Sequence, residues 1–145
     1  DVGGHTNGHI AYVLDSEKIA FVGDALFSLG CGRMFEGQPA QFWASLSKLA
    51  ALPDDTTIYC AHEYTASNAK FALHVDGDNP TLKARAAEVE ALRAAGKPTV
   101  PSMLRDEKAA NPFLRAPALK TKIGMAGASD AEAFAALRKM KDDFR

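Results

Sequence analysis

The sequence predicts an α/β (α+β) fold, with strands in the N-terminal part and helices through the C-terminal half. Three short apolar runs, at 9–14, 19–22 and 56–60, are rich in β-branched and aromatic residues, which is typical of strands. After residue 64, apolar residues recur instead at helical spacing, between residues that favour helix ends. With 145 residues, 47% of them hydrophobic, the chain can bury a sizeable core.

A β-hairpin is expected first, because the polar residues 15–18 separate the first two apolar runs. A helix follows over 38–52, where Phe42 and Leu46 share one face and Pro53 prevents continuation. This helix connects the second strand to the third.

Local capping signals delimit the helices of the C-terminal half. Asn79 and Pro80 supply an N-cap and a first-turn proline, and Ser129 with Glu132 forms a capping box. The expected helices cover 65–75, 80–95, 102–111 and 129–140, with Thr65 as the cap of the first and Ser102 opening the third.

Charge is unevenly distributed along the chain, although the net charge is only −1. Residues 1–82 carry 4 basic and 10 acidic groups, whereas residues 83–145 carry 13 basic and 8 acidic groups. The basic residues of the second part alternate with acidic ones and lack an aromatic platform, so nucleic acid is not an expected partner. A small anionic substrate, or simply a solvated helix face, explains them better.

Membrane insertion and secretion are not expected from this sequence. No apolar run approaches the roughly 18 to 20 residues of a membrane span, and no signal peptide is recognisable, so a cytoplasmic location is expected. Cys31 and Cys60 follow no metal-binding or redox spacing and are expected to be reduced. Because the first residue is Asp1 rather than methionine, the chain is expected to begin inside a larger protein.

His5, Asp24 and His62 each end or follow a short apolar run. Loops at strand ends carry chemistry on a rigid scaffold, so these three side chains are expected at one edge of the sheet. Imidazole and carboxylate together favour Zn, Fe or Mn over Ca or Mg. Three ligands are too few for a closed structural site, and the other residues offer no second set. The pattern therefore predicts half of a metal site.

Four segments carry a family resemblance: GGHTNGHI, GDALFSLGCGRMFEG, CAHEYTASNAKFA and LRDEKAANPFLR. In order and spacing they resemble the second half of glyoxalase II, the hydroxyacylglutathione hydrolase family of the metallo-β-lactamase superfamily. The ending LRKMKDDFR extends the likeness to nearly the whole chain. The resemblance implies that residues 1–64 are the C-terminal half of a metallo-β-lactamase αββα sandwich. It also implies that residues 65–145 form an all-helical domain that binds the glutathione part of a substrate.

By this resemblance, His5 binds one metal ion, His62 binds the other, and Asp24, the catalytic residue, bridges both. The complete protein would hold two divalent metal ions, zinc or else iron or manganese. The family's remaining ligands belong to an upstream HxHxDH motif, which this chain does not contain. His9 is expected to be structural, and His74 is expected to lie on a helix surface.

The resemblance also implies a set of substrate contacts. Guanidinium and ammonium groups can pair with the carboxylates of glutathione, arginine in a bidentate manner. Arg105 and Lys108, three residues apart, could instead only solvate a short helix. Phe35 lacks the hydroxyl of family members that have tyrosine there. The implied contact residues are Arg33, Phe35, Tyr64, Arg105 and Lys108.

The implied reaction is hydrolysis of the thioester S-(2-hydroxyacyl)glutathione. With S-D-lactoylglutathione the products would be glutathione and D-lactate, as in methylglyoxal detoxification. A hydroxide held by two metal ions would attack the thioester carbonyl. This agrees with a sequence that has neither a GxSxG elbow nor a Cys and His pair in catalytic spacing.

The segment alone is expected to be inactive and to bind divalent metal weakly or not at all, because the HxHxDH ligands are missing. It would need the missing N-terminal half of the fold as a partner, and an uncovered sheet face should otherwise cause association or poor solubility. Two further interpretations remain. One is a noncatalytic glutathione-binding module, and the other is a different superfamily hydrolase or a persulfide oxygenase, against which the EKxxNPFLR segment argues.

Overall fold

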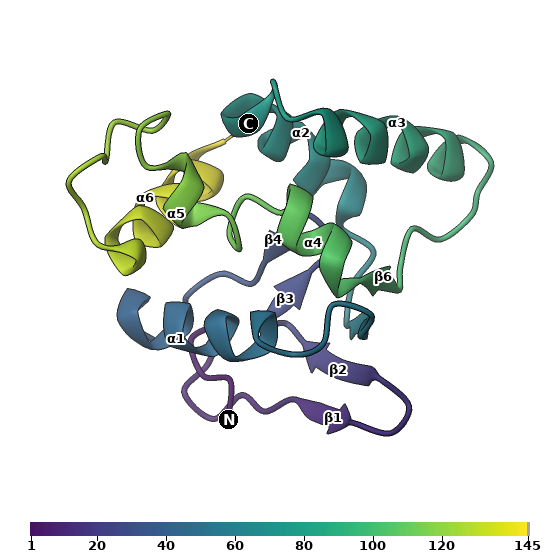
Figure 1. Cartoon of the computed structure of the whole chain (residues 1–145), viewed down its shortest axis with the longest axis horizontal. Helices are drawn as coiled ribbons and strands as arrows, with labels where there is room; N and C mark the ends of the chain where they lie inside the picture. Colours follow the sequence, from purple (N-terminus) through teal and green to yellow (C-terminus); the bar gives the residue numbers. More distant parts are fainter. Residues whose placement is uncertain (145) are drawn as a thin grey trace.

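A four-stranded sheet anchors the N-terminal part of the computed structural model, which describes residues 1–144 (Figure 1). In sheet order its strands are β1 (Tyr12–Leu14), β2 (Ile19–Gly23), β5 (Thr57–Cys60) and β6 (Ser102–Met103). The β1 and β2 strands form the predicted hairpin, β2 runs parallel to β5, and β5 runs antiparallel to β6. The predicted mixture of strands and helices is confirmed.

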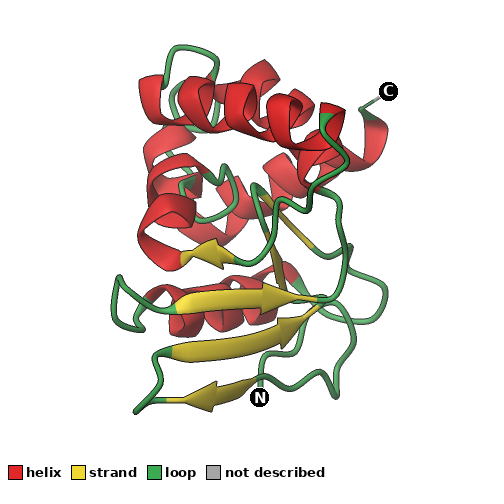
Figure 2. Ribbon diagram, turned by 90° about the vertical axis from the view of Figure 1, so that its right-hand side faces the viewer, coloured by secondary structure: helices red, strands yellow, loops and turns green. Residues whose placement is uncertain are grey.

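Helix α1 (Pro39–Ala50) covers one face of this sheet and lies behind the strands in Figure 2. Gln38 and Gln41 form a capping box at its start, and Pro39 occupies the first turn. The helix presents a buried apolar face to the sheet, as its sequence spacing predicts. The residues that share this core are Phe42, Leu46 and Leu49 of the helix and Ala20, Val22 and Ile58 of the sheet.

The opposite face of the sheet is apolar but exposed. Side chains alternate between the two faces of a strand, so the neighbours of the buried residues point away from α1. On that face Tyr12, Phe21 and Tyr59 are 66%, 46% and 38% exposed. Phe21 and Tyr59 stack across β2 and β5, with ring centroids 5.1 Å apart. Aromatic residues in a contiguous exposed patch usually mark an interaction surface.

A short hairpin follows directly after the end of β2, outside the four-stranded sheet. Strands β3 (Leu26–Phe27) and β4 (Gly30–Cys31) pair through Phe27 and Gly30, with a two-residue turn between them. Leu29 in this turn has a φ of 56°, in the left-handed region that most residues avoid. The sequence does not predict these strands, because two residues are too few to show an alternating pattern.

The C-terminal half is helical, as predicted. Its helices are α2 (Thr65–Asp76), α3 (Pro80–Ala94), α4 (Leu104–Ala110), α5 (Ala116–Leu119) and α6 (Asp130–Asp143). The caps predicted at Asn79 and Ser129 are confirmed, since Asn79 accepts hydrogen bonds from the N–H groups of Thr81 and Leu82 and the Ser129–Glu132 capping box forms at α6. No helix within residues 1–144 has the length and apolar character that a membrane crossing needs.

Two local predictions are wrong. The sequence predicts that Ser102 opens a helix, but Ser102 instead pairs with Ile58 at the edge of the sheet, and α4 begins two residues later. The sequence also predicts Thr65 as a helix cap. Its hydroxyl instead lies 2.6 Å from the hydroxyl of Thr99, within the segment that precedes β6. In both cases a partner distant in sequence outweighs the local signal.

One hydrophobic core joins the two units that the sequence predicts. Phe42 of α1 meets Phe134 of α6 edge to face, with ring centroids 5.4 Å apart. Phe113 contacts the same Phe134 ring at 6.1 Å and stacks on Phe71 of α2 at 5.9 Å. The helical part is therefore packed against α1 and the sheet, and the cavity described next lies where they meet.

Candidate functional site

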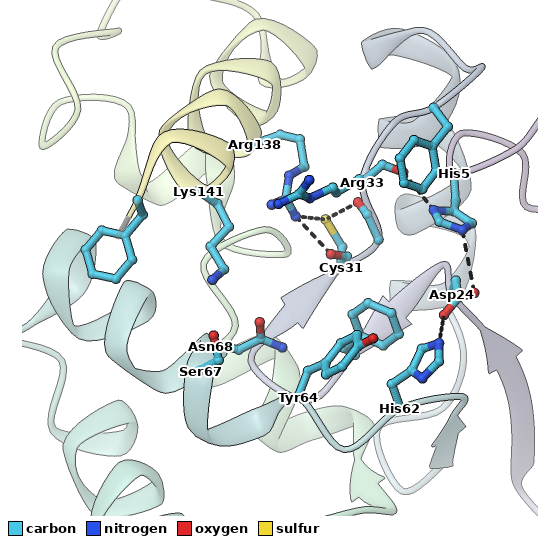
Figure 3. A pocket seen from close by; sticks show the side chains of 14 residues that line it. His5, Asp24, Cys31, Arg33, His62, Tyr64, Ser67, Asn68, Arg138 and Lys141 are labelled. Atoms are coloured by element: carbon cyan, nitrogen blue, oxygen red, sulfur yellow. Dashed lines mark hydrogen bonds and ion pairs between the residues drawn. The ribbon is translucent and has the colours of Figure 1, made fainter.

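An open cavity of about 680 Å³ lies between the strand ends and helices α2 and α6 (Figure 3). Its lining combines histidine and carboxylate groups on one side with cationic groups on the other. The lining residues are His5, Asp24, Phe27, Cys31, Gly32, Arg33, Phe35, His62, Tyr64, Ser67, Asn68, Arg138, Lys141 and Phe144. The arrangement suits an elongated ligand with different chemistry at its two ends.

The three predicted metal ligands do meet at one edge. Asp24 follows β2 and His62 follows β5, and because these strands are parallel their ends lie side by side. The Nε2 atom of His62 is 3.1 Å from Oδ1 of Asp24. The Nε2 atom of His5, from the N-terminal loop, is 3.5 Å from the other carboxylate oxygen, Oδ2. Asp24 therefore stands between the two histidines, one at each oxygen (Figure 3).

The hydrogen bonding of His5 makes this edge suitable for a cation. Its Nδ1 lies 2.8 Å from the carbonyl oxygen of Arg33, an acceptor only, so Nδ1 carries the hydrogen. In the neutral ring Nε2 then holds a lone pair that faces the Asp24 carboxylate. Oδ1 of Asp24 is itself buried, and although Nε2 of His62 lies 3.1 Å away, it accepts no well-aligned hydrogen bond within residues 1–144. A cation bound here would be coordinated by the lone pair of His5 and by the Asp24 carboxylate, so these electron-rich atoms would no longer face each other without a partner.

The ligand candidates form two pairs that share Asp24. Within the described residues, no three His, Cys, Asp or Glu side chains are grouped so that they could hold one metal ion. The pairs His5–Asp24 and Asp24–His62 would each leave a divalent ion with open positions. The residues present thus fit part of a metal centre.

His62 is held in place by aromatic neighbours. Its ring stacks on that of Tyr64 with centroids 4.7 Å apart and an interplanar angle of 14°. Phe27 meets both rings at their edges, at 5.9 Å from His62 and 5.4 Å from Tyr64. Between His62 and Tyr64, Glu63 accepts hydrogen bonds from the N–H and the hydroxyl of Thr99, both at 2.6 Å. The loop that carries both cavity residues is therefore fixed.

His9 and His74 lie outside the group of ligand candidates. The N–H of Asp24 donates to Nε2 of His9 at 3.0 Å, so His9 orients the backbone of Asp24. A Cβ added at Gly23, which has a φ of 53°, would come within 2.8 Å of the His9 ring. The ring of His74 packs beside Phe144, with centroids 5.2 Å apart.

Cations gather on the side of the cavity away from the histidines. Arg138 is only 4% exposed and donates to the carbonyl oxygen of Cys31 and to Asp142, both at 2.9 Å. Nε of Arg33 lies 3.6 Å from the same Asp142 carboxylate. Burial, together with the charges of Arg138 and Arg33, lowers the pKa of Lys141. Three cations thus share one nearby carboxylate, which leaves a positive region suited to an anionic ligand.

The structure brings together some of the predicted substrate contacts and separates others. Arg33, Phe35 and Tyr64 line the cavity, and the Phe35 ring lies 5.1 Å from that of His5. Arg105 and Lys108 do not line it. Lys108 instead pairs with Asp54 at 2.6 Å, in the loop between α1 and β5.

The position of α4 explains this separation. Leu104, Glu107 and Asn111 are 0%, 1% and 0% exposed and occupy the inward side of the segment. At 3.6 residues per turn, Arg105 and Lys108 then face outward. Arg138 and Lys141, which the sequence analysis did not assign, take the cationic positions instead. In the sequence these two residues are three positions apart within LRKMKDDFR, which is the same spacing as that of Arg105 and Lys108.

Comparisons with known proteins agree with this geometry. The family model described as metallo-beta-lactamase superfamily matches residues 1–62. The model described as hydroxyacylglutathione hydrolase C-terminus matches residues 63–144. Hydroxyacylglutathione hydrolases of Maricaulis maris and Ruegeria pomeroyi are 59% and 60% identical, over 97% and 99% of this chain.

The same comparisons define how much of those proteins is present. The aligned parts are 56% and 57% of these two relatives, so the chain spans about half the length of the curated relatives it matches. Among solved structures, ETHE1 from Myxococcus xanthus aligns with a TM-score of 0.55 and 24% identity, over 99% of this chain and 44% of that one. That likeness concerns the fold alone.

Proposed function

The chain belongs to the hydroxyacylglutathione hydrolase family, and from this premise we propose that it is part of a thioester hydrolase acting on S-(2-hydroxyacyl)glutathione. The family models and the curated relatives confirm the resemblance that the sequence motifs indicate. The observation that carries the proposal is that the two ends of one cavity differ in chemistry. Asp24 stands between two histidines at one end, and Arg33, Arg138 and Lys141 stand at the other.

The metal end would hold divalent ions, as the metallo-beta-lactamase match implies. His5 and Asp24 would serve one ion and Asp24 and His62 a second, with further ligands from outside this chain. Zinc, iron or manganese suits such ligands. When bound, the ions would lower the pKa of a coordinated water and polarise the carbonyl of the thioester. His9, by holding the backbone of Asp24, keeps the shared carboxylate in position.

The cationic end would bind the glutathione part of the substrate. Arg33, Arg138 and Lys141 can pair with its carboxylates, and desolvation inside the cavity strengthens such contacts. Tyr64 and Phe35 lie nearer the histidines, where they can flank the thioester. D-lactate would be the second product when the acyl group is D-lactoyl.

The thiol that lines the cavity is poorly suited to attack the thioester. Cys31 lines the cavity, but burial raises the pKa of its thiol to about 11 despite the nearby Arg138. A thiol with this pKa stays protonated at neutral pH and is a poor nucleophile. Attack by water on the thioester, with glutathione thiolate as the leaving group, fits these residues better.

The exposed sheet face supports a partner from the same fold. Tyr12, Phe21 and Tyr59 form an apolar surface of the kind that a second sheet covers in a sandwich. We propose that this face packs against the other half of an αββα sandwich, which would also bring the missing metal ligands. Residues 1–64 would then complete the catalytic domain, and residues 65–145 would form the glutathione-binding domain. A cytoplasmic location fits the unpaired Cys31 and Cys60.

A noncatalytic glutathione-binding module is the second candidate. One observation favours it for the segment alone: the cationic end lies entirely within this chain, whereas the metal end has two candidate ligands per ion. The two candidates differ in what they require of metal. Glutathione binding by the metal-free chain is compatible with both, and thioester hydrolysis with only the first.

The substrate proposal is tested by calorimetric titration of the chain with glutathione. Arg138→Ala or Lys141→Ala should weaken binding roughly ten- to a hundredfold, because each removes a charge-assisted contact. Lys139→Ala is the matched control. It lies on the same helix, pairs with Asp143 and is 79% exposed, so its loss should leave the affinity unchanged. Equal glutathione affinity in all three variants would contradict the proposal that the cationic end binds glutathione.

The metal proposal is tested by adding the N-terminal half of a family member to the chain. We expect thioester hydrolysis and about two divalent metal ions per complex. Asp24→Asn should remove the activity, whereas the chain alone should hold metal weakly and be inactive. Tight stoichiometric zinc binding by the chain alone would contradict the proposed division of ligands.

A further inference from the structure

A buried polar cluster lies behind the cavity, outside its lining. Its centre is Glu107 of α4, whose carboxylate is 1% exposed. Oε2 of Glu107 accepts the N–H of Leu29 at 2.8 Å and the amide of Asn111 at 3.0 Å. Both residues belong to the segment LRDEKAANPFLR, whose outward cations the cavity does not use. The inward residues of this segment therefore need an explanation of their own.

Asn111 connects the cluster to the β3–β4 hairpin. Its Nδ2 lies 3.0 Å from the carbonyl oxygen of Phe27 and 2.9 Å from that of Gly30, so its two N–H groups are shared among these oxygens and Oε2 of Glu107. Phe27 and Gly30 are the pair that closes the hairpin. Its Oδ1 accepts the N–H of Phe113 at 3.0 Å, so the whole side chain is engaged. Asn111 is 0% exposed, and water cannot replace these bonds without rearrangement.

The turn of the hairpin depends on these contacts. The left-handed φ of Leu29, 56°, is unfavourable for a residue with a side chain. Leu29 is also 1% exposed, so its N–H would be unsatisfied without Glu107. On the other side of the turn, Asn68 donates to the carbonyl oxygen of Ser28 at 3.1 Å. Side chains from α2 and α4 thus hold a turn that its own sequence disfavours.

The position of this hairpin sets both ends of the cavity. Phe27, three residues after Asp24, contacts the rings of His62 and Tyr64. On the second strand, the carbonyl oxygen of Cys31 accepts a hydrogen bond from Arg138. A shift of the hairpin would therefore displace both Phe27, which packs against His62, and the Cys31 carbonyl group, which binds Arg138.

The contacts of Glu107 indicate that it positions neighbouring groups rather than adding to the stability of the fold. The donors around its carboxylate are the Leu29 N–H, the Asn111 amide and the hydroxyls of Ser28 and Ser102, and all of them are uncharged. Burial raises the pKa of Glu107, so its ionised form is disfavoured in the folded chain. A well-packed apolar side chain would cost less at such a position, but it could not accept the Leu29 N–H.

We propose that Glu107 and Asn111 are positioning residues, which hold the β3–β4 hairpin so that Phe27 orients His62 and Tyr64 and Cys31 anchors Arg138. The proposal rests on the proposed function for the role of these cavity residues. It gives a role to Glu107 and Asn111, the inward residues of the EKxxNP motif, whereas the outward Lys108 pairs with Asp54.

The test compares Glu107→Leu with Asp76→Leu in the full chain. Asp76 is the matched control, because its carboxylate is also 1% exposed and also joins distant segments, but it does not contact the hairpin or line the cavity. NMR spectra would report the ring signals of His62 and Tyr64 and the hydrogen exchange of the Leu29 amide, and calorimetry would report glutathione binding.

For Glu107→Leu, which removes the acceptor of the Leu29 N–H, we expect shifted His62 and Tyr64 ring signals, at least tenfold faster exchange at Leu29 and about tenfold weaker glutathione binding. Asp76→Leu should leave the ring signals and the glutathione affinity unchanged, and should speed the exchange of Leu29 no more than that of other buried amides. Unmoved ring signals in Glu107→Leu, or equal changes in both variants, would overturn the proposal. If Glu107→Leu does not fold, Leu29 exchange in the unmodified chain decides, since a rate like that of exposed loops would also overturn it.

The same design separates this proposal from the proposed function. A chain that binds no glutathione would refute the substrate assignment, whereas the ring signals and the exchange of Leu29 would still report on the hairpin. A chain that binds glutathione with unmoved ring signals in Glu107→Leu would retain the substrate assignment and lose the positioning role.

Discussion

Two buried carboxylates, Asp76 and Glu107, are equally hidden from solvent at 1% exposure, yet they are supported in opposite ways. Asp76 accepts hydrogen bonds from the charged groups of Arg115 at 3.0 Å and Lys122 at 2.6 Å, and from Asn79 at 2.8 Å. Glu107 accepts from uncharged donors. The first is the centre of an ion-pair network, and the second is a hydrogen-bond acceptor held in an apolar region.

The pKa values of these two groups move in opposite directions. Burial alone raises the pKa of each carboxyl. At Asp76 the contacts from Lys122, Asn79 and Arg115 outweigh burial and hold the pKa below its usual value. At Glu107 burial outweighs the hydrogen bonds, and the pKa is raised. The difference indicates that Asp76 contributes to stability, whereas Glu107 is retained for the geometry of the hairpin.

The largest effect on stability is expected from Asp76→Ala. Removing the carboxylate leaves the buried side of Arg115 and Lys122 without an anion, so the free energy of unfolding should fall by about 2–3 kcal/mol, allowing for the partial exposure of both cations. Urea unfolding measures this. Asp78→Ala is the control, since Asp78 also pairs with Lys122 but is 76% exposed, and its loss should change little. A comparable loss in both variants would show that burial is not the source of the effect.

A smaller and more local effect is expected from Asn111→Ala. The variant leaves the carbonyl oxygens of Phe27 and Gly30 unsatisfied, so we expect about 2 kcal/mol less stability together with shifted His62 ring signals. Asn79→Ala is the counterpart near Asp76. It removes a helix cap worth about 1 kcal/mol but should leave the His62 signals in place. Unfolding curves and NMR spectra of the two variants together decide whether the hairpin is coupled to the cavity.

The smallest effect is a pH dependence of opposite sign at the two carboxylates. The folded pKa of Asp76 is lowered, so its contribution is complete above the unfolded value of about 3.9 and is lost as pH falls through the folded pKa. The folded pKa of Glu107 is raised, so its ionisation penalty disappears as pH falls through that value toward the unfolded value of about 4.3.

Urea unfolding between pH 7 and pH 3 of the chain and of Asp76→Asn and Glu107→Gln measures this difference. On acidification, the stability advantage over Asp76→Asn should shrink, whereas the stability relative to Glu107→Gln should rise. The same sign for both comparisons would contradict the assigned roles.

Local signals account for the parts of the fold that the sequence predicts correctly. Asn79 caps α3 and Ser129 begins α6 because each bonds to groups within three residues of itself. The hairpin of β1 and β2 follows from an alternating pattern around a polar turn. Short elements that exist only through distant partners were missed. The β3–β4 hairpin depends on side chains of α2 and α4, and β6 depends on β5.

The sequence by itself determined the family and the edge at which His5, Asp24 and His62 meet, because strand ends and motifs are encoded locally. Only the tertiary structure decided which cations face the cavity. Arg105 and Lys108 have the same spacing as Arg138 and Lys141. The inward side of α4 is occupied by apolar residues and the Glu107 cluster, which turns its cations outward. A helix sequence fixes which residues share a face, but the packing of the whole chain decides where that face points.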